Sequence, residues 1–222
     1  MNTIIIIFNL LLTFQACHPK TTNPTINMVH QNLIQEVKNN DVSEVKKALE
    51  NGADVNQVDA ENRSLLLIAT MQQNYNMAVL LLKHGADVNQ QAANKDSAFL
   101  YAGATGQTNL LKHFLVNGAR FDVFNRYNGT ALIPACERGH IETVKLLANT
   151  KDFPINHVNR LGWTALMEAI VLGDGSPKYQ QIVQILKDAG ADMHIPDYEG
   201  ITPLQHAQKR GLKEIVQIIK PN

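Results

Sequence analysis

Four related segments recur along the chain and decide its fold: NGADVN at 51–56, HGADVN at 84–89, NGARFD at 117–122 and AGADMH at 189–194. The first two intervals between their glycines are 33 residues each, and the third is 72 residues, which is two periods of 33 plus six. A fixed period of this length indicates a solenoid in which each unit buries its apolar faces against its neighbours. The chain therefore consists of stacked repeats.

A second signature has the same period: NRSLLLIA (62–69), KDSAFLYA (95–102), NGTALIPA (128–135), GWTALMEA (162–169) and GITPLQHA (200–207). Its hydroxyl residues are Ser64, Ser97, Thr130, Thr164 and Thr202, spaced 33, 33, 34 and 38 residues apart. One and five extra residues account for the six found above. A Ser or Thr directly before an apolar run is a favourable helix N-cap. We therefore predict that a helix starts after each hydroxyl.

Glycines lie at the turns that follow the predicted helices. One set marks the turn between the two helices of a repeat: Gly106, Gly139 and Gly211. Another set follows the second helices, where a left-handed residue is favoured: Gly52, Gly85, Gly118 and Gly190. Repeat four departs from the pattern, because Pro134 lies just inside its first helix, which we expect to be strained or shortened.

These motifs resemble the ankyrin repeat, with its T-P-L-H-x-A, G-H-x-E-I-V and G-A-D-V-N elements. The resemblance covers residues 26–222 and implies an all-α solenoid of about six helix-turn-helix repeats with short hairpin-like turns. Its repeats are expected near 26–58, 59–91, 92–124, 125–158, 159–196 and 197–222. Three features depart from the family pattern. The histidine of T-P-L-H is absent, NTKDFPINHV ends repeat four without a glycine, and repeat five carries an insertion around GDGSPKY at 173–179.

The composition excludes several classes of protein. The chain of 222 residues is 45% hydrophobic and 18% charged, which is inconsistent with intrinsic disorder. Its 20 basic and 20 acidic residues give no net charge to steer nucleic acid, so no nucleic-acid partner is expected. Two cysteines cannot form a disulfide framework or a cysteine-based zinc site.

The N-terminal residues have the pattern of an export signal. An uncharged apolar stretch from Ile4 to Phe14 matches a signal-peptide core and is too short to span a bilayer. Ala16 and Cys17 resemble the end of a bacterial lipoprotein box, although Phe14 and Gln15 depart from it. We predict a signal peptide over 1–16, lipidation of Cys17 and a flexible tether over 17–25. The alternatives are a buried apolar segment with an incidental Cys17, or an uncleaved anchor.

Catalytic and metal-binding patterns are weak in this sequence. Cys136 and His140 are four residues apart, but they also fit a small core position and the turn between helices. The histidines occupy different phases of the repeat, so they predict no shared metal site. The sequence lacks a phosphate-binding glycine loop, H-E-x-x-H and G-x-S-x-G. We therefore predict no catalytic residue, no metal and no cofactor, with a thiol enzyme using Cys136 and His140 as the rival hypothesis.

The resemblance implies that a partner protein binds at the turn tips and the inner face of the first helices. At these positions, repeats four to six carry the only Trp, two of the five Tyr and four Arg, the residue types enriched in binding hot spots. The candidate partner-binding residues are Arg126, Tyr127, Arg138, Arg160, Trp163, Tyr198 and Ile201. Alternatively, Trp163 packs only on the adjacent turn.

The sequence thus predicts a non-catalytic scaffold for protein–protein interaction in the bacterial cell envelope, in the form of a monomer. The expected location is the periplasm, with the protein anchored to a membrane as a lipoprotein or, alternatively, soluble. An immunity-type or inhibitory binder of a toxin or enzyme is the alternative function. Replacing Arg126, Tyr127 and Trp163 with alanine is expected to abolish partner capture without unfolding the chain.

Overall fold

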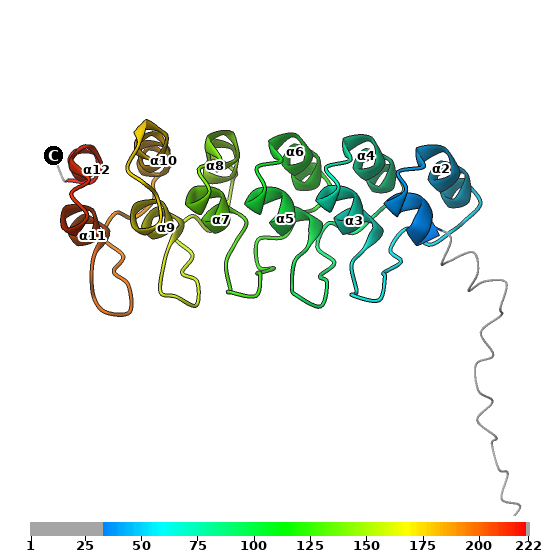
Figure 1. Ribbon diagram of the computed structural model, residues 1–222, viewed down its shortest axis with the longest axis horizontal. Helices are drawn as coiled ribbons and strands as arrows, with labels where there is room; N and C mark the ends of the chain where they lie inside the picture. The colour runs from blue at the N-terminus through cyan, green and yellow to red at the C-terminus, as the bar shows by residue number, and fades with distance from the viewer. Residues whose placement is uncertain (1–32, 221–222) are drawn as a thin grey trace, which may run out of the picture.

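A computed structural model describes residues 33–220 as a row of stacked helix pairs. The predicted signal peptide, Cys17, the tether and the start of repeat one lie outside these residues. The first helices of the repeats form one row, the second helices form a parallel row, and the turns project beyond the first-helix row (Figure 1). Residues 33–38 are helical and precede the eleven named helices. These are α2 (Val42–Glu50), α3 (Leu65–Met71), α4 (Tyr75–Lys83), α5 (Ala98–Ala104), α6 (Thr108–Val116), α7 (Leu132–Glu137), α8 (Ile141–Ala148), α9 (Ala165–Val171), α10 (Pro177–Asp188), α11 (Pro203–Lys209) and α12 (Lys213–Ile219).

The predicted N-caps are confirmed in four of the five repeats. The hydroxyls accept hydrogen bonds from the backbone N–H three residues later, at 3.1 Å for Ser64, 3.3 Å for Ser97, 3.2 Å for Thr164 and 3.3 Å for Thr202. Gln205 also returns its side chain to the backbone N–H of Thr202, which completes a capping box. The hydroxyl signature therefore marks the helix starts that it predicts at these four positions.

Repeat four is the exception, and the prediction of Thr130 as its N-cap is wrong. Helix α7 begins one residue later, at Leu132, with Ala131 at the N-cap position. This shift places Pro134 at the third helical residue, whose N–H has no partner within the helix in any case. Had Thr130 been the cap, the missing N–H would have removed the first helical hydrogen bond. As expected, α7 is shorter than the first helices of repeats two, three, five and six, with 6 residues against 7 in each of them.

The core runs continuously through the stack. Alanines five residues after each cap hydroxyl are fully buried and let adjacent first helices approach closely: Ala69, Ala102, Ala135, Ala169 and Ala207. Between α5 and the start of α7, Gly103 leaves no room for a side chain, since a Cβ atom there would lie 2.6 Å from that of Ala131. Where repeat four lacks its terminal glycine, Asp152 adopts a φ of 60° and Phe153 packs 4.9 Å from the ring of Phe121.

The insertion in repeat five lengthens both the connection and the second helix. Three residues separate α3 from α4, whereas five residues, 172–176, separate α9 from α10. Helix α10 has 12 residues against 9 in α4, with Pro177 at its first position. The two extra residues in the connection and the three extra residues in the helix account for all five inserted residues. Tyr179, within the inserted region, is only 7% exposed and joins the core.

Each repeat donates a side-chain hydrogen bond to a carbonyl near the end of the preceding first helix. Carbonyls at a helix end lack the usual partner one turn ahead, and a donor from the next repeat bonds to them. Thr70 O also accepts the backbone N–H of Gln73 at 3.0 Å. Arg138 Nη1 donates to Ala104 O at 2.6 Å, and Arg210 Nη1 donates to Gly173 O at 2.7 Å and to Ile170 O. The other bonds in this series run from Gln72 to Lys38 O (2.7 Å), from Gln107 to Thr70 O (3.0 Å) and from Tyr179 to Glu137 O (2.7 Å).

Candidate functional site

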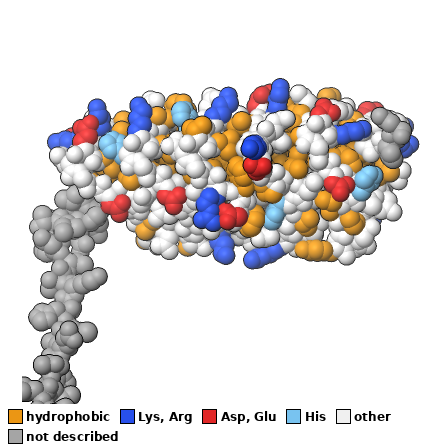
Figure 2. Space-filling model, turned by 180° about the vertical axis from the view of Figure 1, so that it is seen from behind, with side chains coloured by type: hydrophobic (Ala, Val, Ile, Leu, Met, Phe, Trp, Pro, Cys, Tyr) orange, Lys and Arg blue, Asp and Glu red, His pale blue; other side chains and the backbone are white. Residues whose placement is uncertain are grey.

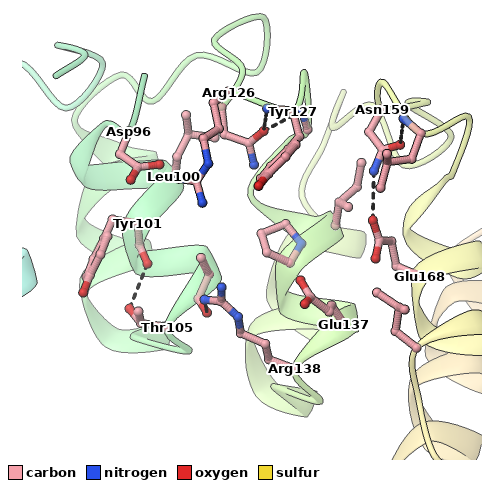
Figure 3. Close-up of a pocket in the computed structure, with 17 residues that line it drawn as sticks. Asp96, Leu100, Tyr101, Thr105, Arg126, Tyr127, Glu137, Arg138, Asn159 and Glu168 are labelled. Carbon is pink, nitrogen blue, oxygen red and sulfur yellow. Dashed lines mark hydrogen bonds between the residues drawn. The ribbon is translucent and has the colours of Figure 1, made fainter. Parts of the chain in front are cut away.

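A groove of about 560 Å³ lies between the turn tips and the first helices of repeats three to five. Helices α5, α7 and α9 form its floor, and the turns that precede α7 and α9 form one side (Figure 3). We call this cavity the central groove. Its lining residues are Asp96, Leu100, Tyr101, Ala104, Thr105, Asn125, Arg126, Tyr127, Gly129, Ile133, Pro134, Glu137, Arg138, Asn159, Leu161, Glu168 and Leu172.

Large apolar side chains around the central groove are exposed to solvent. Tyr127 and Leu161 are each 51% exposed, and Leu172 is 49% exposed. The space-filling view of one face shows hydrophobic side chains gathered over the middle and C-terminal part of the solenoid, among charges of both signs (Figure 2). Grouped exposed apolar residues are typical of an interaction surface. Leu161 and Leu172 line the central groove although the sequence-based list omitted them.

Three of the seven predicted binding residues line the central groove: Arg126, Tyr127 and Arg138. The guanidinium of Arg126 lies 4.8 Å from the centre of the Tyr127 ring, a cation–π contact at the turn tip. Arg138 is exposed, and its side chain extends toward the end of α5 (Figure 3). The structure therefore brings this part of the predicted surface together in one place.

The other four predicted residues lie beside the central groove and do not line it. Trp163 is half-buried, so the expectation of an exposed tryptophan is wrong. Its backbone N–H donates to Asn159 Oδ1 at 3.1 Å, and its carbonyl accepts the Asn159 N–H at 3.0 Å. Ile201 is also half-buried. Tyr198 is 76% exposed, and Arg160 is exposed with its backbone N–H bonded to Tyr127 O at 2.9 Å.

The floor of the central groove holds a buried carboxyl group that sequence analysis missed. Glu168 of α9 is only 4% exposed, and its Oε1 accepts a hydrogen bond of 2.8 Å from Asn159 Nδ2. Asn159 is held in turn, since its Oδ1 accepts the backbone N–H groups of Leu161 and Trp163 at 2.9 Å and 3.1 Å. The signal in the sequence was a lone acid inside ALMEAIV, an otherwise apolar helix.

The pKa of Glu168 is raised from 4.5 to about 7, first by burial and then by the nearby charge of Glu137, against the lowering effect of the Asn159 hydrogen bond. Glu137 lies on α7, and its side chain shares the floor of the central groove with Glu168 (Figure 3). Perturbed carboxyl groups in a concave site are candidates for function. Here one such group, Glu168, lies beside a second carboxyl group, Glu137, on the floor of the groove.

The arrangement of Cys136 argues against a thiol enzyme. The Cys136 side chain is fully buried, and burial together with the charge of Glu168 raises the pKa of its thiol well above the ordinary value. Such a thiol is a poor nucleophile, because the thiolate is the reactive form. Burial also lowers the pKa of His140. Within residues 33–220, no group of three or more His, Cys, Asp or Glu side chains is arranged to hold a metal ion.

Comparison with known protein families identifies the repeats. The family model for ankyrin repeats (3 copies) matches residues 33–125 and again 98–197, which together span most of the chain. The chain belongs to the ankyrin-repeat family. Ankyrin repeats serve as scaffolds for protein–protein interaction, and their fold is typically non-catalytic. The described part of this ankyrin-repeat chain has no helix long and apolar enough to cross a membrane.

Individual relatives support the same assignment. The ankyrin repeat protein YahD of Escherichia coli K12 is 37% identical over 179 residues, covering 81% of this chain and 89% of YahD. The crystal structure of an ankyrin repeat domain from Acinetobacter baumannii AYE matches with a TM-score of 0.82 and 45% identity, covering 85% of this chain and 95% of that one. The ankyrin repeat domain of Bcl-3, at 22% identity and a TM-score of 0.75, covers 84% of this chain and 83% of its own and shares the fold alone.

Proposed function

We propose that this protein is a non-catalytic scaffold that captures a partner protein in the central groove. The observation that carries the proposal is the groove of about 560 Å³, with Tyr127, Leu161 and Leu172 about half exposed around it. Side chains of this size at the edge of a concave surface can bury apolar area against a partner without refolding. Arg126, ordered against Tyr127, adds a cation at the same edge.

The proposal places the protein in the bacterial cell envelope, with residues 1–16 removed and Cys17 lipidated. The apolar stretch from Ile4 to Phe14 and the Ala16–Cys17 pair support this location, and a soluble periplasmic form is the alternative. Mass spectrometry of the protein purified from membranes tests it. A mature chain that starts at Cys17 and carries acyl groups is expected, whereas an intact Met1 would contradict export and lipidation.

Affinity capture from cell-envelope extract tests the central groove. The bait is the tagged protein, compared with a variant that carries Tyr127→Ala, Leu161→Ala and Leu172→Ala. We replace Leu161 and Leu172 instead of Trp163, because Trp163 is half-buried and lies outside the groove. A partner recovered by the wild type should be lost from the variant by about tenfold or more, since hot-spot truncations each cost on the order of 1–2 kcal/mol.

The matched control removes exposed apolar groups elsewhere on the solenoid. Tyr75 on α4 is 44% exposed and Val116 on α6 is 80% exposed, and neither lines the central groove. The double variant Tyr75→Ala and Val116→Ala should retain the partner, and far-UV circular dichroism should be unchanged in both variants. Equal recovery by the wild type and the groove variant would contradict the proposal. An abundant envelope protein as the partner would favour a scaffold, and a single rare toxin or enzyme would favour an inhibitory binder.

A further inference from the structure

The floor of the central groove carries acidic groups without an internal counter-ion. Among the residues that the structure describes, neither Glu137 nor Glu168 takes part in an ion pair, although seven such contacts occur elsewhere. Glu168 is 4% exposed and uses Oε1 for Asn159, while its Oε2 accepts no hydrogen bond from residues 33–220. A carboxyl group this far removed from water is costly to ionise and tends to hold a proton, unless a cation or donor is brought to its unbonded oxygen.

The neighbouring arginines are bound to backbone carbonyls. Arg138 of repeat four donates to Ala104 O, and Arg210 of repeat six donates to Gly173 O and Ile170 O. Repeat five has Leu172 at the equivalent position, eight residues after the cap hydroxyl, so it contributes no guanidinium. Repeat five therefore contributes no cation to the lining of the central groove.

We propose that the central groove recognises a partner segment through one lysine or arginine side chain, held between the carboxylates of Glu137 and Glu168. This inference rests on the proposed function, because it names the chemistry of the segment that the groove accepts. The apolar part of that side chain would pass over Leu172 and Leu161, and its charged end would reach the free oxygen of Glu168. A charged donor on a carboxylate forms the stronger class of hydrogen bond.

The edge of the central groove limits what surrounds this basic residue. Arg126 and Arg138 also line the groove, so a uniformly basic segment would be repelled there. The exposed rings and methyl groups of Tyr127, Leu161 and Leu172 favour apolar neighbours. The expected recognition element is thus a single basic residue flanked by apolar or acidic residues, which distinguishes it from the basic stretches that bind many acidic surfaces.

Selection from a displayed library of random peptides, with the wild-type protein as bait, tests this chemistry. Peptides that also bind the variant carrying Tyr127→Ala, Leu161→Ala and Leu172→Ala are discarded as binding elsewhere. The remaining peptides are expected to share one Lys or Arg next to apolar residues. Replacing that residue with norleucine in a synthetic peptide should weaken binding to the wild type by about tenfold or more, as measured by calorimetry.

The same replacement is then measured on a variant with Glu137→Gln and Glu168→Gln, which keeps side-chain length and the acceptor for Asn159. On this variant, the norleucine and basic peptides should bind about equally. Glu142→Gln is the control, because Glu142 lies in the first turn of α8, exposed and outside the central groove. It should retain the tenfold preference. Groove-dependent peptides without a basic residue, or a preference that survives the double variant, would overturn the inference while leaving the proposed function standing. A library without any groove-dependent peptide would overturn both.

Discussion

The interface between repeats three and four and the interface between repeats four and five each supply a hydrogen-bond donor to the end of a first helix, but the donors differ. At the first, Arg138 follows the end of its own first helix and reaches back to Ala104 O at 2.6 Å. At the second, Leu172 occupies the position that Arg138 has in repeat four, and the Tyr179 hydroxyl of α10 donates to Glu137 O at 2.7 Å. The carbonyl at the helix end is satisfied in both, but the donor comes from a different helix.

This difference shows how an insertion can change a surface without changing the fold. Once the second helix of repeat five supplies the donor through Tyr179, the first-helix position no longer has to be polar. Leu172 can then line the central groove, and no arginine from repeat five neutralises Glu168. The acidic floor of the groove is therefore a consequence of where repeat five places one hydrogen-bond donor.

The largest effect is expected from Glu168→Gln. Because the folded pKa of Glu168 is about 7 instead of 4.5, the folded state binds more protons than the unfolded state between these values. Stability should therefore fall as pH rises through this window, and the loss should be complete above it. The shift corresponds to at most about 3 kcal/mol. The variant should exceed the wild type by up to this amount at about pH 8.5 and match it at about pH 4.5.

Urea unfolding at the two pH values measures this difference, with Glu142→Gln as the control for loss of a surface charge. The groups that face Glu168 from α7 are Glu137 and Cys136. The charge of Glu137 raises the pKa of Glu168, and the charge of Glu168 raises the pKa of the Cys136 thiol. A stability difference that is the same at both pH values would show that the titration of Glu168 does not cause it.

A smaller effect separates the two interfaces directly. Tyr179→Phe removes the donor to Glu137 O from a side chain that is only 7% exposed, and should cost about 1–2 kcal/mol of unfolding free energy. Arg138→Leu removes the corresponding donor from an exposed side chain, where water can replace it, and should cost less than about 1 kcal/mol. Equal losses in chemical denaturation would mean that the two donors are equivalent after all.

The smallest effect on stability is expected from Leu172→Arg, which gives repeat five the residue that repeat four has. Leu172 is 49% exposed, so the change should alter the unfolding free energy by less than about 0.5 kcal/mol. A cation beside Glu168 should nevertheless lower its pKa from about 7. Titration of the side-chain carboxyl carbon by NMR measures this, with Leu172→Met as the neutral control. An unchanged pKa in the arginine variant would disprove the proposed role of Leu172.

Most of the fold could be predicted from the sequence, because each repeat reuses the same local chemistry. The period, four of the five cap hydroxyls and the turn glycines reflect backbone requirements that depend only on nearby residues. Gly106 and Gly139, for example, adopt φ values of 72° and 75°. The cap at Thr130 could not be predicted in this way, since the start of α7 depends on where the missing N–H of Pro134 is tolerated.

The candidate site was less predictable, because exposure and pairing depend on neighbouring repeats. Arg126, Tyr127 and Arg138, chosen by their positions in the repeat, do lie together along the central groove. Trp163 was expected to be exposed, but its position in the turn leaves it half-buried. Glu168 was missed because its importance depends on the lack of a cation beside it. That lack follows from the apolar Leu172 and from the backbone bonds of Arg138 and Arg210, which the sequence of one repeat does not show.

The donors to the ends of the first helices run in one direction, from each repeat to the one before it. Gln72, Gln107, Arg138, Tyr179 and Arg210 each complete a helix that the ribosome made earlier. During synthesis, the first helix of a repeat can therefore accept this hydrogen bond only after the following repeat has left the ribosome. Translation and the formation of these bonds proceed in the same direction, with the bonds one repeat behind.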